Sequence, residues 1–129
     1  MAKRILIVED NAPTREILCK LVSDRHYDVS EAADGDDAIE AIKRGNIDGM
    51  LLDLLMPNRD GIEVLVWLKS EYPGMPVVVM TQAGGGHDIS YPEIAERFGA
   101  ARAFRKPVTA KKVVEALSIL EETWAAASS

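Results

Sequence analysis

Short apolar runs alternate along this sequence with longer segments whose apolar residues recur three or four positions apart. The runs are continuous, which is typical of strands that are buried on both faces of a sheet. The longer segments carry one apolar stripe each, as helices that cover such a sheet do. This alternation predicts an α/β domain with a parallel sheet between two layers of helices. The expected strands are residues 3–8, 27–31, 50–52, 77–80 and 101–105.

Cap-type residues, prolines and glycines mark the ends of the expected helices. Asn11 begins the first helix, and Pro13 follows it in the first turn, where proline is tolerated. We expect Asp36 to cap the second helix and Gly45 to end it. Thr109 is expected to cap the last helix. The third and fourth helices are expected over residues 62–69 and 92–98.

Helical spacing also predicts which side chains face the sheet. We expect Cys19, in the first helix, to be a buried structural thiol. The last residues, 125–129, are expected to fray because little packing holds a chain end. The predicted inward-facing residues are Ile17, Leu18, Leu21, Val22, Ala38, Ile39, Ile42, Leu65, Leu68, Val113, Leu117, Leu120 and Trp124.

Length and composition narrow the class of protein. The chain has 129 residues, of which 47% are hydrophobic, which suits one domain with a real core. Its net charge of −6 argues against direct binding to nucleic acid or to anionic membranes. The first apolar run is too short for a signal peptide, and no segment approaches the roughly 20 apolar residues that span a bilayer. We therefore expect a single cytoplasmic domain over residues 1–129, with its core at about 3–122 and no output domain.

Polar residues stand at the ends of four of the expected strands. Glu9 and Asp10 follow the first, Asp53 ends the third, Thr81 follows the fourth and Lys106 the fifth. The carboxyl ends of parallel strands share one edge, so these side chains should gather there. Three acids in one place would repel one another unless a cation lay among them. Carboxylate oxygens without histidine or cysteine partners favour Mg²⁺.

Asp53 is the central residue of this group. A carboxylate at the end of a buried run must be hydrogen-bonded, paired or bound to a metal, because burying a lone charge is costly. A carboxylate can also act as a nucleophile and form an aspartyl-phosphate. Lys106 offers a positive charge and Thr81 a hydroxyl donor for phosphoryl oxygens. The residue types therefore favour phosphoryl transfer to Asp53.

In their order and spacing, these residues resemble the signature of the receiver domains of response regulators in two-component signalling. The resemblance covers about residues 3–122, nearly the whole chain. It implies a flavodoxin-like, doubly wound, five-stranded parallel sheet in the order 2-1-3-4-5, with five helices. The matching pieces are Glu9-Asp10, Asp53 followed by Met56-Pro57 and Gly61, then Thr81, and Lys106-Pro107.

The resemblance also implies a phosphoacceptor and a metal site. Asp53 would accept a phosphoryl group from the phosphohistidine of a sensor histidine kinase or a histidine-phosphotransfer protein. Mg²⁺ would be ligated by Asp10, Asp53 and the backbone carbonyl of Leu55, with Glu9 acting through water.

A switch is implied as well. Lys106 would contact the phosphoryl group, Thr81 would move to hydrogen-bond it, and the Lys106-Pro107 bond would be cis. One position departs from the family pattern, because Ala103 stands where a tyrosine or phenylalanine usually precedes the lysine by three residues. Phe104 is adjacent, but strand alternation should point it to the opposite face, into the core. Thr81, Ala103 and Phe104 are the candidate switch residues.

These implications describe a stand-alone response regulator, a signalling switch rather than an enzyme. Phosphorylation of Asp53 would alter binding to a downstream effector protein, with the regulator a monomer or a phosphorylation-dependent dimer. The glycine-rich residues 84–87 are expected to form a mobile loop that could close on phosphorylation. The alternative is an intermediate phosphate carrier in a multistep phosphorelay. A hydrolase of the haloacid-dehalogenase type would need a second acid where Leu55 stands.

Overall fold

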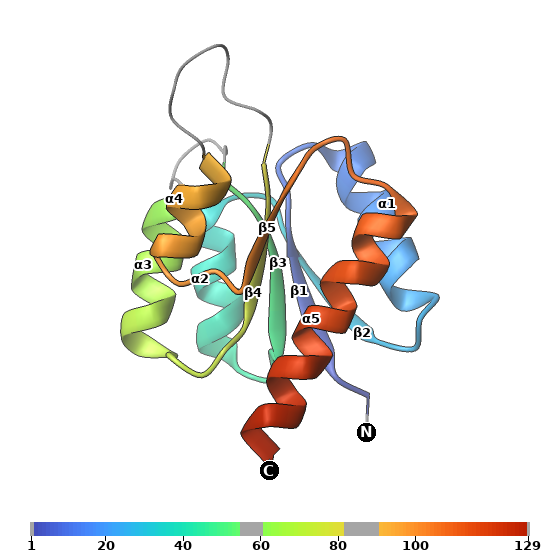
Figure 1. The fold of residues 1–129 in the computed structure, drawn as a ribbon. Helices are drawn as coiled ribbons and strands as arrows, with labels where there is room; N and C mark the ends of the chain where they lie inside the picture. The colour runs from blue at the N-terminus through green and yellow to red at the C-terminus, as the bar shows by residue number, and fades with distance from the viewer. Residues whose placement is uncertain (1, 55–60, 82–90, 129) are drawn as a thin grey trace.

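The computed structural model describes residues 2–54, 61–81 and 91–128 of the chain. Within them, five strands alternate with five helices (Figure 1). The strands are β1 Arg4–Val8, β2 Asp28–Ala32, β3 Gly49–Asp53, β4 Val77–Thr81 and β5 Arg102–Arg105. The helices are α1 Ala12–Ser23, α2 Gly35–Arg44, α3 Gly61–Glu71, α4 Tyr91–Arg97 and α5 Ala110–Ser128.

The strands form one parallel sheet in the order β2-β1-β3-β4-β5. Helices α1 and α5 cover one face, and α2, α3 and α4 cover the other (Figure 1). The predicted flavodoxin-like architecture and strand order are therefore confirmed. None of the helices in the described parts of the chain is long and apolar enough to cross a membrane.

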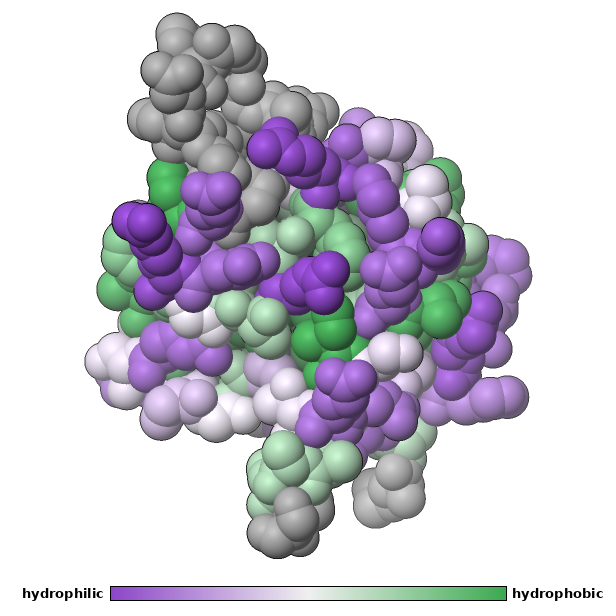
Figure 2. Space-filling view, viewed as in Figure 1, coloured by the Kyte–Doolittle hydropathy of each residue, from purple (hydrophilic) through white to green (hydrophobic). Residues whose placement is uncertain are grey.

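Two apolar cores lie on the two sides of the sheet, because successive side chains of a strand point to opposite faces. In β1, Ile5 and Ile7 pack toward α1 and α5, whereas Leu6 and Val8 pack toward α2 and α3. Each large apolar side chain buried in this way contributes roughly 1.5–3 kcal/mol. Figure 2 shows hydrophilic side chains over most of one face of the molecule, with hydrophobic ones in small areas between them.

Most of the predicted helix ends are confirmed. The Asn11 side chain accepts a hydrogen bond from the backbone N–H of Thr14 at 2.9 Å, and α1 begins at the next residue. Gly45 ends α2 with a φ of 93°, in the left-handed region that glycine tolerates. The Thr109 hydroxyl accepts from the N–H of Lys112 at 3.2 Å, at the start of α5.

Two predictions about helix ends are wrong. Asp34, not Asp36, caps α2, because its carboxylate accepts from the N–H of Asp37 at 2.8 Å. Asp36 lies inside the first turn, where its negative charge still favours the helix. Helix α5 continues to Ser128 instead of fraying from residue 125. Trp124 holds this part of the helix, because its indole N–H donates to the carbonyl of Asp48 at 2.9 Å.

Two predictions about α1 side chains are wrong as well. Leu18 and Val22 are buried as expected, but Ile17 is 59% exposed. Ile17 lies about 100° around the helix from Leu18, which turns it away from the sheet. Cys19 is only half-buried, beside Glu31 and Arg15.

Candidate functional site

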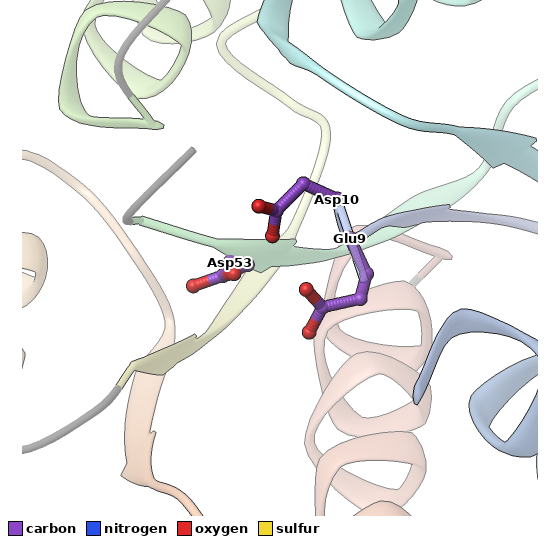
Figure 3. A group of neighbouring side chains, drawn as sticks. All are labelled: Glu9, Asp10 and Asp53. Atoms are coloured by element: carbon purple, nitrogen blue, oxygen red, sulfur yellow. The ribbon is translucent and has the colours of Figure 1, made fainter. Parts of the chain in front are cut away.

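Three carboxyl groups meet at the carboxyl end of the sheet. Glu9 and Asp10 directly follow β1, and Asp53 is the last residue of β3. One carboxylate oxygen of each lies within 4.8 Å of the others, and the three side chains point into a common space (Figure 3). Asp53 comes 44 residues after Glu9 and 43 after Asp10, but the three are adjacent in space because β1 and β3 pair directly. We call these three residues the acid cluster.

The members of the acid cluster differ in burial. Glu9 and Asp53 are only 1% and 5% exposed, whereas Asp10 is exposed to solvent. Two charges this deeply buried need close partners of opposite charge or hydrogen-bond donors. A cation could enter from the side of Asp10.

Lys106 supplies a positive charge inside the cluster. Its ammonium Nζ lies 2.7 Å from Glu9 Oε1 and 3.3 Å from Asp53 Oδ2, and its side chain is 17% exposed. The residue comes from the segment between β5 and α5, where the predicted cis bond between Lys106 and Pro107 is confirmed. Its backbone N–H donates to the carbonyl of Thr81 at 2.9 Å, which ties it to the end of β4.

The side chain and the backbone of Glu9 are both held. Glu9 Oε1 accepts from Lys106, and Oε2 accepts from the backbone N–H of Asn11 at 3.2 Å. Its N–H donates to the carbonyl of Ala32 at 3.1 Å. Its own carbonyl accepts from Arg15 Nη1 at 2.8 Å.

The sequence reasoning missed Arg15. The sequence does hold a signal for it, which is a basic residue in the first turns of a predicted helix. A cation there lies at the positive end of the helix dipole, so it needs a specific partner.

The ionisation of the site follows from these contacts. Burial alone raises the pKa of Glu9, but the hydrogen bonds from Lys106 and Asn11 lower that pKa below its ordinary value. Burial lowers the pKa of Lys106, but the neighbouring carboxylates of Glu9 and Asp53 raise it above the ordinary value. Some loss of hydration beside the cluster and the nearby Glu9 raise the pKa of Asp10. The buried pair of Glu9 and Lys106 is therefore ionised at neutral pH.

Thr81 and the β5 residues lie beside the cluster. Thr81 is fully buried at the end of β4, next to the strand that carries Asp53. Ala103 packs toward the core under α2, α3 and α4, whereas Phe104 packs toward the core under α1 and α5. The prediction that these two neighbours face opposite sides of the sheet is confirmed. Ala103 also donates its backbone N–H to the carboxylate of Glu96 on α4 at 3.2 Å.

A glycine permits the close packing behind Asp53. Gly61, the first residue of α3, donates its N–H to the carbonyl of Leu54 at 3.0 Å. A Cβ atom at Gly61 would lie 2.5 Å from the Cα of Leu54 and 2.7 Å from the carbonyl oxygen of Asp53. Only glycine fits this contact without a shift of the backbone. The other expected residues of this segment, Leu55 and Met56-Pro57, lie outside the described residues, as does the expected loop at 84–87.

A cavity of about 820 Å³ opens over the acid cluster and continues along the start of α1. Asp53 and Lys106 line it at the cluster, and Thr14, Ile17 and Val108 line it farther out. Ile17, which the helical pattern assigned to the core, therefore forms part of the wall of the site.

The donors of the cluster suit a hard divalent cation. All three offer carboxylate oxygens as ligands, and among the described residues the ammonium of Lys106 is paired with two of them, Glu9 and Asp53. Such an excess of negative charge attracts a cation, and an all-oxygen donor set fits Mg²⁺ better than zinc or copper.

Comparison with known proteins identifies the family of this chain. The family model of the response regulator receiver domain matches residues 5–118. The response regulator MprA of Mycobacterium ulcerans is 40% identical over 81 residues, which are 63% of this chain and 35% of MprA. The chain therefore spans only about a third of the length of this curated relative.

Solved structures agree with the family match. NtrX from Brucella abortus is 29% identical, with a TM-score of 0.87 over 99% of this chain and 29% of its own. A CheY-like response regulator receiver domain protein from Methanospirillum hungatei is 25% identical, with a TM-score of 0.84 over 95% of this chain and 97% of its own. With the family model matched over most of its length and the strand order observed, the chain belongs to the response regulator receiver domains of two-component signalling.

Proposed function

We propose that this receiver domain is a phosphorylation-controlled switch that acts in the cytoplasm. Asp53 takes a phosphoryl group from a phosphohistidine on a sensor histidine kinase or a histidine-phosphotransfer protein. Phosphorylation then changes the affinity for a downstream effector protein. The observation that carries this proposal is the ammonium of Lys106, which lies against Asp53 and Glu9 at the mouth of a cavity.

The transfer step uses the carboxylate of Asp53 as the nucleophile. One of its oxygens attacks the phosphorus atom, a new O–P bond forms, and the P–N bond to the donor histidine breaks. The imidazole leaves with the electron pair of that bond and takes up a proton. Lys106, at 3.3 Å from Asp53 Oδ2, is placed to donate a hydrogen bond to a phosphoryl oxygen. Thr81, the last residue of β4, is the proposed second hydrogen-bond donor to the phosphoryl oxygens.

Mg²⁺ would be held by the carboxylates of Asp10 and Asp53 together with the backbone carbonyl of Leu55. Glu9 would act through water, since both of its carboxylate oxygens already accept hydrogen bonds, from Lys106 and Asn11. When bound, Mg²⁺ would neutralise negative charge on the phosphoryl oxygens.

The proposal is tested with Asp53→Asn. With acetyl phosphate and MgCl₂, the wild-type protein should gain one phosphoryl group, detected by intact mass spectrometry. The variant should gain none, because an amide is a poor nucleophile. Asp24→Asn is the matched control, because Asp24 is an exposed acid at the far end of α1. Stable phosphorylation of Asp53→Asn would refute the assignment of Asp53.

The oligomeric state is a second consequence of the proposal. A monomer and a phosphorylation-dependent dimer are separated by light scattering on the protein with and without beryllofluoride and Mg²⁺. The effector itself has to be identified by binding that requires the modified form of Asp53.

A further inference from the structure

We propose that Arg15 is a positioning residue for the acid cluster. Its guanidinium fixes the turn between β1 and α1, and this turn carries Glu9 and Asp10. The inference deepens the proposed Mg²⁺ site and, in that part, rests on the proposed function.

The contacts of Arg15 join two strand ends. Its Nη1 donates to the carbonyl of Glu9 at 2.8 Å, and its Nε donates to Glu31 Oε1 at 3.2 Å. Glu9 follows β1, and Glu31 lies near the end of β2. A planar guanidinium holds its donors in a fixed fork, so it sets the direction of the Glu9 carbonyl as well as its distance. The side chain of Arg15 is only 20% exposed, which limits its freedom.

The direction of the Glu9 carbonyl matters because it sets the plane of the peptide bond that leads to Asp10. Asp10 lies beyond the last residue of β1 and is exposed, so neither the sheet nor the core holds it in place. Its carboxylate nevertheless lies within 4.8 Å of those of Glu9 and Asp53. Arg15 thus hydrogen-bonds the carbonyl of the peptide group that leads directly to Asp10, the exposed member of the acid cluster.

The dipole of α1 opposes a cation at this position, although the guanidinium of Arg15 also pairs with the carboxylate of Glu31. Arg15 is the fourth residue of α1, near the positive end of the helix dipole, and the first turn of α1 has no acidic residue. A guanidinium near the acid cluster also repels a divalent cation. Removal of the charge alone should therefore strengthen Mg²⁺ binding, whereas loss of positioning should weaken it. The two effects differ in sign, which makes the proposal testable.

The first experiment needs no metal. Amide hydrogen exchange is measured by NMR on the metal-free wild type, on Arg15→Met and on Lys20→Met. Lys20 is a matched control on the same helix, with an exposed ion pair to Asp24. We expect the Asn11 amide, which donates to Glu9, to exchange at least fivefold faster in Arg15→Met and unchanged in Lys20→Met. The amides of Leu51 and Val78 in the core strands report global stability. An unchanged rate at Asn11 in Arg15→Met would overturn the proposal.

The second experiment titrates MgCl₂ into the same proteins by calorimetry. The dissociation constant of Arg15→Met should be about fivefold higher than that of the wild type, and that of Lys20→Met within twofold. A constant for Arg15→Met that is equal to or lower than that of the wild type overturns the positioning role and leaves the proposed function intact. A wild type that binds no Mg²⁺ refutes the proposed metal site, and the exchange rate at Asn11 then decides the role of Arg15 alone. If Arg15→Met does not fold, Arg15→Lys, which keeps the charge and loses the fork, is judged by the same criteria.

Discussion

Replacing Gly61 by alanine tests whether the packing of α3 against the end of β3 sets the geometry around Asp53. The added Cβ would lie 2.5 Å from the Cα of Leu54, and the next two closest atoms are the backbone oxygens of Asp53 and Leu54. Ordinary contact begins at 3.4 Å, so helix and strand end must separate by about 0.9 Å (3.4 minus 2.5). All three atoms belong to the backbone, so no side chain can rotate away.

The cost can be estimated from comparable substitutions. Overpacking a tight contact costs about 1–3 kcal/mol. The higher helix propensity of alanine offsets at most about 1 kcal/mol of this cost, and it offsets less at the first residue of a helix, which Gly61 occupies. We therefore expect Gly61→Ala to lose roughly 2 kcal/mol of unfolding free energy. For a chain of this size, that corresponds to a fall in the melting temperature of about 8 °C.

The assay compares two glycine-to-alanine variants by urea unfolding and by the rate of phosphorylation with acetyl phosphate. Gly74 is the matched control, because a Cβ there meets nothing within 4 Å. Gly74→Ala should be neutral or slightly stabilising, because alanine restricts the unfolded chain. Gly61→Ala should be less stable and should phosphorylate more slowly, since the shift moves the backbone that carries Asp53. A Gly61→Ala protein as stable and as reactive as the wild type would refute the packing argument.

Two further predictions concern the end of the sheet opposite the acid cluster. Trp124→Phe keeps a large ring but loses the N–H bond to the Asp48 carbonyl, so it should cost about 1 kcal/mol in urea unfolding; no loss would mean that this bond does not hold α5. Burial and the hydrogen bond to Glu121 raise the pKa of Tyr27 to about 12. That pKa is above the unfolded value of about 10. The protonated phenol of Tyr27 therefore contributes fully to the free energy of unfolding below pH 10, and this contribution is lost as the pH rises toward 12. The stability difference between the wild type and Tyr27→Phe should shrink over this range, and a constant difference would contradict the assigned bond.

Local patterns in the sequence were enough to predict a parallel α/β sheet, and the family resemblance added the strand order. Continuous apolar runs and helical stripes predicted the alternation of strands and helices, because burial follows these periods. The strand ends predicted which polar residues meet, since parallel strands place their carboxyl ends at one edge. Glu9, Asp10 and Asp53 do lie together. The alternation of side chains along a strand also placed Ala103 and Phe104 on opposite faces of the sheet.

Neighbouring positions with similar propensities were harder to resolve. Asp34 and Asp36 are both good caps, and only the backbone conformation selects Asp34. Ile17 and Leu18 both fit the helical stripe, but the angle at which α1 lies on the sheet turns Ile17 into the wall of the cavity. Such choices differ by little in local energy, so long-range packing decides them.

The sequence by itself determined the kinds of elements, their order and the residues at the carboxyl ends of the strands, because all of these follow from local periodicity and caps. Only the tertiary structure decided how the charges pair. Lys106 lies closer to Glu9 than to Asp53, and Arg15 joins the ends of β1 and β2. These contacts depend on how strands and helices distant in sequence lie against one another, and that arrangement exists only once the whole sheet has formed.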